Sequence, residues 1–455
     1  MVPSLQQWRK PALILAILTV LGVLLTHWFA WPLTWPLGLR LPVDVEVYWQ
    51  GAREFWLADD LYDIRYDTTF DNLPFTYPPF GALVFTPLWW IHDLFGLLVT
   101  ERVFALITLL TTYAVAVFLL RLAGVRDRVW EFVAFAALLV SAPVYFTLNI
   151  GQINVVLMAL TLFDVTLPRS TRHSGVLKYV PLGVLTGIAA AIKLTPLVFG
   201  LYFLILWVVT KSPRGLFGMI GGFLGSSGLA VIFRPSISIQ YFTDVLFTAE
   251  RIGDLHFARN VSIRAVLERL PELGPTASIM WLVAVALVII AVAVAAYRIL
   301  RTDLSAHNRL LAVSLVSLVA LLCSPVSWYH HWVWLGPLIV ALWLTQHRWL
   351  ALWGAFAVTF GSFHNFLPSE NNVELTWPWW MHVLAAHYLI FSAVVTAVFS
   401  CGKMPQKQSF PTNRSGVSHL HDLRLKLCLN TNGVFMFKKR TPGFDEPPDS
   451  TCCRV

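Results

Sequence analysis

Apolar segments long enough to cross a lipid bilayer recur along the chain from residue 11 to residue 400. A bilayer core about 30 Å thick requires roughly 20 consecutive apolar residues in each spanning helix. By this criterion we predict about twelve helices, near residues 11–30, 101–120, 131–148, 152–167, 179–193, 196–210, 215–232, 278–297, 309–324, 332–346, 349–366 and 378–400. The pattern therefore predicts an all-α polytopic membrane protein, in which the two short segments around Lys193 are broken elements that meet at a cavity.

Composition supports the same interpretation. Hydrophobic residues make up 57% of the 455 residues and charged residues only 13%, whereas a soluble domain has about 25% charged residues. The formal charge of +8 raises the possibility of nucleic-acid binding, but the Lys and Arg residues gather in short loops between apolar segments, as in cytoplasmic loops of membrane proteins. We therefore expect membrane lipid, and no nucleic acid, as a partner. None of the five cysteines forms a CxxC pair, so we expect no disulfide framework and no zinc site.

The charged loops predict an orientation in the membrane. If the N-terminus is cytoplasmic, alternation along the chain places the short basic loops on the cytoplasmic side, as the positive-inside rule requires. These loops contain Arg121, Arg126 and Arg128; Arg169, Arg172 and Lys178; Lys211 and Arg214; Arg298, Arg301 and Arg309; Arg348; and Lys403 and Lys407. Both termini are then cytoplasmic, and residues 31–100 form an acid-rich first extracytoplasmic loop at the cell (plasma) membrane. Within it, residues 78–91 are too short to span and predict an interfacial helix.

Two parts of the chain differ in composition. Residues 1–400 contain all the apolar segments and are expected to form one transmembrane domain. Residues 401–455 are polar and rich in Pro, Ser and Lys, which is typical of a disordered tail, here on the cytoplasmic side.

The unusual polar clusters all fall on the predicted extracytoplasmic face. They are the stretches 39–63, "FTYPPF" (75–80), "LNIGQINV" (148–155), "AIKLTP" (191–196) and "CSPVSWYHHWVW" (323–334). The clusters were chosen by their polarity and the topology by basic charge. Because these two criteria are independent, the location of every cluster on one face is informative. It predicts a functional site on this face.

Lys193 is the most costly residue of these clusters. A lysine within an apolar helix costs about 2.5–3.5 kcal/mol on insertion scales, so it is expected to face a wet cavity or an anion. The alternative is a lysine that extends from a helix end to the interface. Pro196 is expected to break the helix beside it.

Other polar residues have both a functional and a structural interpretation. His330 and His331 either contact a phosphate or sugar or lie in the interface; adjacent histidines are a poor metal pair, and no HExxH motif occurs, so no metal is expected. Gln152 and Asn154 either bind hydroxyl groups or cap the turn between two helices. Asn260 and Ser262 match a glycosylation sequon, a match that is common by chance.

Asp44 and Glu46 begin a helical stretch in the first extracytoplasmic loop. Asp44 is either an N-cap or a reactive carboxylate, because aspartate is favoured at both kinds of position. Glu46 is favoured in a first turn by the helix dipole whatever else it does, and its removal is expected to be mild. Residue chemistry alone leaves the choice between the two acids open.

Taken in order, the motifs resemble one family. They are Asp44-x-x-Val47-Tyr48, Leu61-Tyr62, Tyr77-Pro78-Pro79, Gly151-Gln152-x-Asn154, Lys193-Leu194-Thr195-Pro196 and Ser324-Pro325-x-Ser327-Trp328-x-His330-His331. The chain is similar over residues 40–335 to the GT-C glycosyltransferases of family 87, the polyprenol-phosphate-mannose-dependent α-1,2-mannosyltransferases of actinobacteria. It departs from their pattern at Asp59-Asp60, where the family often has a glycine before the Leu-Tyr pair.

The resemblance implies the fold, the reaction and the site. The fold would be of GT-C type, with about twelve transmembrane helices and interfacial helices in the first loop. Mannose would pass from polyprenyl-phosphate-mannose to a lipid-anchored mannoside, either a phosphatidylinositol mannoside or lipomannan or lipoarabinomannan, with inversion and without a cofactor. Asp44 would be the general base, Lys193 and His330 or His331 would stabilise the phosphate, and substrate would contact Tyr48, Tyr77, Gln152, Asn154 and Trp328.

Three rival interpretations remain. A transporter of lipid-linked sugars would also need an intramembrane lysine, although it would predict internal repeats, which are not evident here. A GT-C transferase of another lipid-linked sugar, arabinose or glucose, would share the motifs. A non-catalytic scaffold would leave the ordered motifs unexplained.

Overall fold

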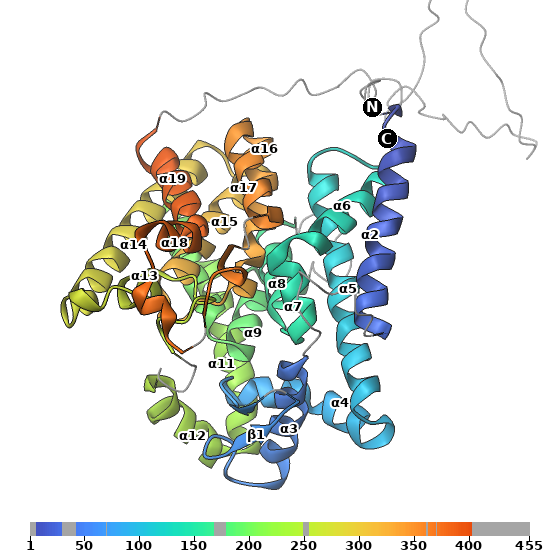
Figure 1. Ribbon diagram of the computed structural model, residues 1–455, viewed down its shortest axis with the longest axis vertical. Helices are drawn as coiled ribbons and strands as arrows, with labels where there is room; N and C mark the ends of the chain where they lie inside the picture. Colours follow the sequence, from blue (N-terminus) through green and yellow to red (C-terminus); the bar gives the residue numbers. More distant parts are fainter. Residues whose placement is uncertain are drawn as a thin grey trace, which may run out of the picture. The chain divides into compact units, whose positions relative to one another are not determined.

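The computed structural model describes residues 6–29, 42–69, 71–167, 179–248, 254–360, 363–369 and 371–402, and these residues are mostly helical (Figure 1). The α-helices are α2 (Arg9–Phe29), α3 (Val43–Leu57), α4 (Pro79–Phe95), α5 (Leu97–Leu122), α6 (Arg128–Val140), α7 (Ala142–Ile150), α8 (Asn154–Thr166), α9 (Val184–Ile192), α10 (Gly200–Thr210), α11 (Arg214–Phe233), α12 (Pro235–Thr243), α13 (Ile263–Glu268), α14 (Thr276–Thr302), α15 (Ala306–Cys323), α16 (Leu335–Leu344), α17 (Arg348–Phe360), α18 (Trp379–Ala385) and α19 (His387–Cys401).

Short 3₁₀ helices and one small hairpin complete the described structure. The 3₁₀ helices are η3 (Thr195–Phe199), η4 (Val245–Phe247), η6 (Pro271–Leu273), η7 (Tyr329–Trp334), η8 (Phe363–Asn365) and η9 (Val373–Thr376). Strands β1 (Arg65–Asp67) and β2 (Asn72–Pro74) pair antiparallel, with Tyr66 opposite Leu73. The predicted all-α class is confirmed, with this hairpin as a minor addition.

Four helices in the described part of the chain are long and apolar enough to cross a membrane, namely α5, α11, α14 and α15. Two further pairs are bent, α6 with α7 by 72° and α18 with α19 by 64°, and each pair could form one broken span. The protein is thus an all-α membrane protein, and the count of twelve crossings stays a prediction. The predicted helix 131–148 is two helices because Pro143, which lacks an N–H group, lies in the first turn of α7.

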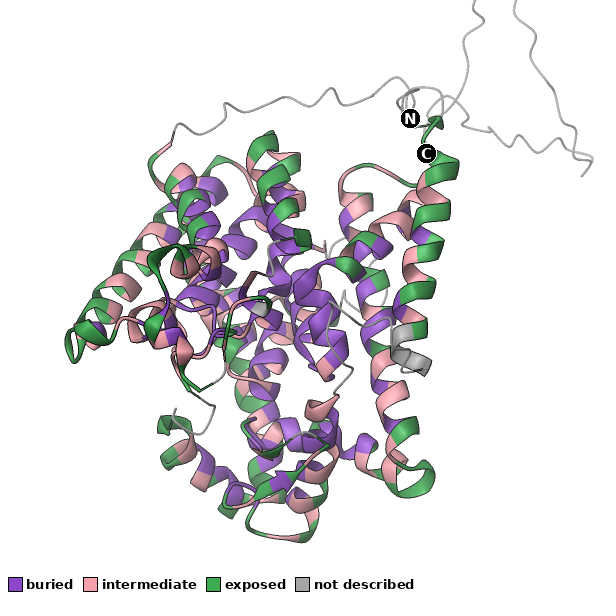
Figure 2. Cartoon of the chain, viewed as in Figure 1, coloured by how far each residue is buried: buried purple, intermediate pink, exposed green. Residues whose placement is uncertain are grey.

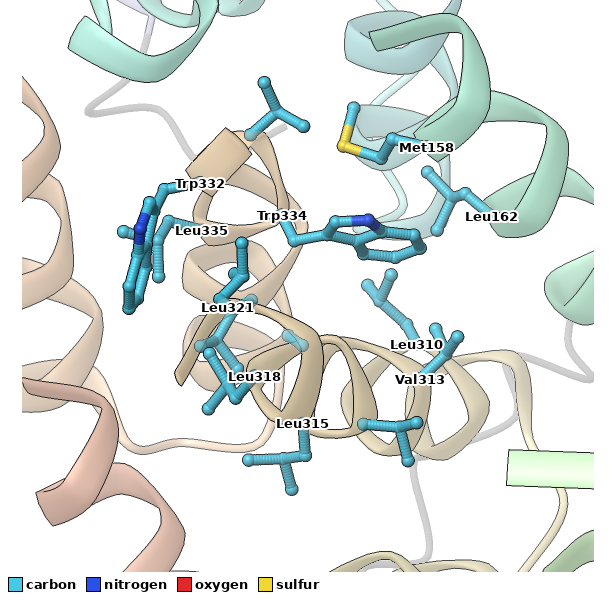
Figure 3. Close-up of a cluster of buried hydrophobic side chains, with 14 of the residues drawn as sticks. Met158, Leu162, Leu310, Val313, Leu315, Leu318, Leu321, Trp332, Trp334 and Leu335 are labelled. Carbon is cyan, nitrogen blue, oxygen red and sulfur yellow. The ribbon is translucent and has the colours of Figure 1, made fainter. Parts of the chain in front are cut away.

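The core lies around α15. Within its most apolar 18-residue window 67% of the residues are buried, against 17% for α14, whose apolar side chains face outward where lipid would lie. Figure 2 shows the buried residues gathered in the central helices and the exposed residues on the outer ones. Figure 3 shows Trp334 beside Met158 and Leu162 of α8, next to the leucines of α15. The helices that position the polar clusters therefore rest on a dense apolar centre.

Several helix ends that the charge pattern assigns to one side are tied together by direct contacts. Arg9 at the start of α2 pairs with Asp127 before α6 at 3.3 Å. His307 at the start of α15 bonds the Leu122 carbonyl at the end of α5, with a ring nitrogen to oxygen distance of 3.0 Å. Arg298 of α14 donates to backbone carbonyls at the end of α19. In Figure 1 these ends lie at the top, whereas α3, α4, the hairpin and α12 lie at the bottom.

The predicted interfacial segment 78–91 forms α4, which begins at Pro79, so proline occupies its favoured first-turn position. The predicted tail, residues 401–455, lies outside the described residues except for its first two. The predicted basic loop with Arg169, Arg172 and Lys178, and residues 31–41 of the first loop, also lie outside them.

Candidate active site

Asp44 is the second residue of α3. Pro42 occupies the N-cap position and no side chain caps this helix, so Asp44 does not serve as the N-cap. The start of α3 packs on the turn between α7 and α8, where Gly151 adopts a left-handed conformation with φ of 74°. A Cβ at Gly151 would lie 2.4 Å from a methyl carbon of Val45, so only glycine permits this approach. The contact places Asp44 beside Gln152.

The Gln152 amide links the two charged groups of the site. Its nitrogen donates a hydrogen bond to the Asp44 carboxylate, and its oxygen accepts from the Tyr77 hydroxyl at 2.9 Å and from Lys193 Nζ at 3.2 Å. Lys193 and Asp44 interact electrostatically, but none of the ion pairs within the described residues joins them directly. Acid and cation therefore share one buried amide.

Lys193 lies where α9 ends. The helix stops at Ile192, and the chain continues into η3, whose first turn contains Pro196, so the expected break is present. Besides Gln152, Lys193 Nζ donates to Asn154 Oδ1 at 3.1 Å and to the Tyr77 hydroxyl at 3.3 Å. A lysine with three oxygen acceptors is fixed in direction, so its ammonium group has a defined position in the site.

The other end of α9 is anchored by a residue that the sequence did not single out. Asp164 of α8 is fully buried, and its carboxylate accepts the backbone N–H groups of Gly183 and Thr186, each at 3.0 Å. It also accepts the Thr186 hydroxyl at 2.8 Å. A carboxylate at a helix N-terminus satisfies otherwise unpaired donors and favours the helix dipole. Asp164 therefore holds the helix that ends at Lys193.

Tyr48 and Tyr77 lie side by side. Their hydroxyl oxygens are 2.7 Å apart, and Tyr48 stacks on Phe85 of α4 with ring centroids 4.0 Å apart. Tyr62, from the Leu-Tyr motif, donates to the Tyr77 carbonyl at 2.8 Å. Tyr48 and Tyr62 are completely enclosed, so they position Tyr77.

The two adjacent histidines occupy different environments. The His330 side chain is buried, and its ring nitrogens have no hydrogen-bond partner among the described residues. Its carbonyl accepts from Thr147 at 3.0 Å and from Asn154 at 3.2 Å. The half-buried His331 lines the cavity described next. Only His331 is therefore placed to contact a ligand there.

A cavity of about 370 Å³ lies beside Lys193. Its lining combines polar and aromatic residues with a few apolar ones, namely Phe75, Thr76, Tyr77, Pro78, Lys193, Leu194, Thr195, Tyr241, Val245, Leu246, Thr248, Ser324, Pro325, Val326, Trp328 and His331. Asn154 lines a smaller adjoining pocket of about 50 Å³. Asp44, Tyr48 and Gln152 do not line the cavity and connect to it through Tyr77 and Lys193.

The electrostatics of Asp44 suit a proton acceptor. Burial raises the pKa of Asp44 from 3.8 to about 6, against the opposing effects of the Lys193 charge and of the hydrogen bond from Gln152. A carboxylate with a pKa near the working pH is a better general base than one with an ordinary pKa. The described residues contain no cluster of three or more His, Cys, Asp or Glu side chains placed to hold a metal ion.

Glu46 has a larger structural role than expected. Its buried carboxylate accepts the Thr69 backbone N–H at 2.9 Å and the Thr69 hydroxyl at 2.8 Å. Glu46 thereby attaches the residues after β1 to α3. The expectation that its removal is mild stays a prediction for activity, whereas for stability we now expect a cost, because two hydrogen bonds to a buried charged acceptor would be lost.

Two further residues hold the loop before η7. Asn260 is fully buried, donates to the Leu255 and Pro325 carbonyls and accepts the Ser327 N–H, so this sequon residue is not available for glycosylation. Arg269 is also buried and donates to a group of backbone carbonyls that includes Asn260. The sequence marked Asn260 only as part of an Asn-x-Ser sequon and did not mark Arg269 at all, so it did not indicate this supporting role for either residue.

Comparisons of the sequence with known proteins identify its family. The model of glycosyltransferase family 87 matches residues 75–325. A phosphatidylinositol mannoside mannosyltransferase of Mycolicibacterium smegmatis, polyprenol-phosphate-mannose-dependent and α-(1-2) by name, is 31% identical over 86% of this chain and 89% of its own. The pentamannoside mannosyltransferase of the same organism is 35% identical over 79% and 82%. The corresponding phosphatidylinositol mannoside enzyme of Mycobacterium tuberculosis is 30% identical over 78% and 84%.

No solved structure matches the chain significantly. The family match and the extended similarity to curated relatives nevertheless agree over most of its length. The chain belongs to glycosyltransferase family 87 and is an enzyme of the glycosyltransferase class.

Proposed function

We propose that this enzyme transfers mannose from polyprenyl-phosphate-mannose to a lipid-anchored mannoside, such as a phosphatidylinositol mannoside, and forms α-1,2 linkages. The names of its relatives support the donor, the acceptor and the linkage. The observation that carries the mechanism is the arrangement of Asp44 and Lys193 around Gln152, beside a cavity that also contains His331. This arrangement supports a mechanism in which Asp44 is the base and Lys193 binds the phosphate.

The proposed reaction is a single displacement with inversion. Asp44 removes the proton from the 2-hydroxyl of the acceptor sugar as that oxygen attacks the anomeric carbon of mannose. The bond between the anomeric carbon and the phosphate oxygen breaks, and polyprenyl phosphate leaves with the bonding electrons. The pKa of Asp44, raised by burial, favours proton capture at neutral pH. Asp44 is only partly buried as a residue, and in this proposal the acceptor hydroxyl approaches its carboxylate from that side.

The cavity fits the leaving group. A lipid phosphate is already anionic, so it needs positive partners and hydrogen-bond donors more than a strong acid. Lys193 and His331 line the cavity, and the Tyr77 ring lies with its centroid 5.1 Å from Lys193 Nζ. Trp328 and Tyr77 offer aromatic faces to a sugar ring or a headgroup. Asn154 supports both sides, because it bonds Lys193 and the His330 carbonyl.

We place this site on the extracytoplasmic face of the plasma membrane. The contacts among the helix ends that carry Arg9, Arg298 and Arg309 support a single basic, cytoplasmic side. The twelve-crossing arrangement, with both termini cytoplasmic, belongs to the same proposal. The proposal also includes the division of the chain into a catalytic domain, residues 1–400, and a cytoplasmic tail, residues 401–455.

The decisive experiment measures transfer by the purified enzyme in lipid nanodiscs. The donor is polyprenyl-phosphate-mannose, the acceptor a phosphatidylinositol mannoside, and the product linkage is analysed. Asp44→Asn is expected to lower the rate by about two to four orders of magnitude, whereas Asp93→Asn, on exposed α4 surface, serves as the matched acidic control. Wild-type activity in Asp44→Asn would contradict the mechanism.

The same assay separates the rival interpretations. Competition by polyprenyl-phosphate-arabinose or polyprenyl-phosphate-glucose with productive transfer would identify a different donor sugar. Movement of the labelled donor across a vesicle membrane without transfer to any acceptor would identify a transporter.

A further inference from the structure

A second cavity lies between two helix pairs. It has a volume of about 500 Å³ and is lined by α5, α6, α16 and α17 and the ends of these helices. Figure 1 shows α16 and α17 on one side and α5 and α6 on the other. It shares no lining residue with the catalytic cavity, so it is a separate site.

The walls of this cavity are hydrocarbon-like. Ser141 and Thr359 are the only polar residues of the lining, and no charged side chain contributes to it. Trp343 and Leu352 line it and are 48% and 53% exposed, so the cavity opens to the outside of the helix bundle. Protein interiors are close-packed. An apolar space of this size, open toward the bilayer, is therefore expected to contain hydrocarbon and not water.

The rim of the cavity is basic. Arg126 follows the lining residue Val125 and is exposed, and the Arg348 guanidinium lies 5.5 Å from the ring centroid of the lining residue Trp343. Neither arginine has a carboxylate partner within the described residues. The neighbouring Arg121, in contrast, is paired with Glu131 at 2.8 Å. Arg348 donates to the neutral Gln346 Oε1 at 3.1 Å, which leaves its charge uncompensated. Two guanidinium charges without a carboxylate partner among the described residues thus lie near the mouth of an apolar cavity.

We propose that this cavity binds one acyl chain of an anionic phospholipid, whose phosphate lies between Arg126 and Arg348. Arginine suits phosphate because its planar fork presents several donors at once. The rim lies at the end of the molecule that carries the basic helix ends, and the cytoplasmic leaflet that such ends face is rich in anionic lipid. The bound lipid would join the α5–α6 pair to the α16–α17 pair as a structural ligand.

The test uses the full-length protein in nanodiscs with phospholipids that carry a photoactivatable group on an acyl chain. Phosphatidylglycerol is expected to label peptides of α6 and α17 about tenfold or more above phosphatidylcholine, because two arginines favour an anionic headgroup. Labelling spread evenly over the exposed face of α14 would overturn the proposal. Preferential labelling of the cavity by a polyprenyl-phosphate probe would also overturn it, because it would identify the isoprenoid donor as the occupant.

Variants test the binding of the acyl chain and the binding of the headgroup separately. Ala355→Trp fills the cavity and is expected to abolish the labelling, whereas Val294→Trp on the exposed face of α14 is the matched control. The double variant Arg126→Gln and Arg348→Gln is expected to retain labelling but to lose the preference for phosphatidylglycerol, and Arg301→Gln is the control for charge. Unchanged labelling in Ala355→Trp, or an unchanged preference in the double variant, would refute the site. The wild-type labelling decides the matter if Ala355→Trp fails to fold.

Discussion

Moderate acid is expected to inhibit this enzyme by protonating one carboxylate, that of Asp44. Its pKa of about 6 leaves only about one molecule in eleven ionised at pH 5, and about 99% ionised at pH 8. Because the base must be ionised to accept a proton, kcat/KM should fall about tenfold between pH 8 and pH 5, with a limiting slope of one below pH 6. If Asp44 had its ordinary pKa of 3.8, the enzyme would lose less than about a tenth of its kcat/KM between pH 8 and pH 5.

The assay is the initial rate of mannose transfer at low donor concentration, from pH 5 to pH 8. Under these conditions the pH dependence of kcat/KM reports the pKa values of groups in the free enzyme. The donor is a phosphodiester that does not titrate in this range. Recovery of full activity after a return from pH 5 to pH 8 controls for unfolding. A flat profile between pH 5 and pH 7 would refute the assignment of the raised pKa to the catalytic base.

The same pKa shift makes Asp44 costly to the folded state. A carboxyl with a raised pKa stabilises the fold below its unfolded pKa of about 3.8 and loses this contribution as the pH rises through about 6. The shift corresponds to about 3 kcal/mol as an upper bound. Asp44→Asn, which stays neutral, should therefore raise the unfolding temperature at pH 7.5 while it removes activity, the usual conflict between stability and function. A lowered unfolding temperature would contradict this reasoning.

The remaining predictions concern neighbouring side chains. Lys193→Met should lower kcat by about 10²–10³ through loss of charge stabilisation at the leaving phosphate, and steady-state kinetics with normal kcat would contradict this role. His331→Ala should lower kcat by a factor on the order of 10². His330→Ala should instead reduce thermal stability and leave the kcat of the folded enzyme near wild type. Equal effects of the two variants on kcat would show that His330 and His331 do not have different roles. Glu46→Ala should lower the free energy of unfolding by about 1–3 kcal/mol, because it removes two hydrogen bonds from Thr69 to a charged acceptor. A wild-type denaturation curve would refute that contribution.

Hydropathy predicted the long helices well because a helix that lies in lipid needs an apolar composition, and hydropathy measures composition. The predicted segments 101–120 and 309–324 correspond to α5 and α15 with ends shifted by a few residues. Hydropathy does not detect a bend, since a bend changes direction and not composition. The segment 131–148 is therefore split at Pro143, and the apolar stretch before Lys193 yields only the nine residues of α9.

The sequence could suggest the residues of the candidate site but not the contacts among them. Polarity against an apolar background selected Lys193 and Gln152, and family resemblance selected Asp44. The orientation of the Gln152 amide and the difference between His330 and His331 depend on packing between segments more than a hundred residues apart. No local pattern encodes such packing.

The Gln152 amide also prevents direct contact between the Asp44 carboxylate and the Lys193 ammonium group. A carboxylate and an ammonium group in a poorly hydrated site attract each other strongly, and direct contact would engage the lone pairs that the acceptor hydroxyl requires. The amide offers its nitrogen to Asp44 and its oxygen to Lys193, so it satisfies both charges and keeps them apart. In the proposed mechanism this neutral amide therefore keeps the base and the cation apart until a substrate brings a hydroxyl proton to Asp44 and a phosphate to Lys193.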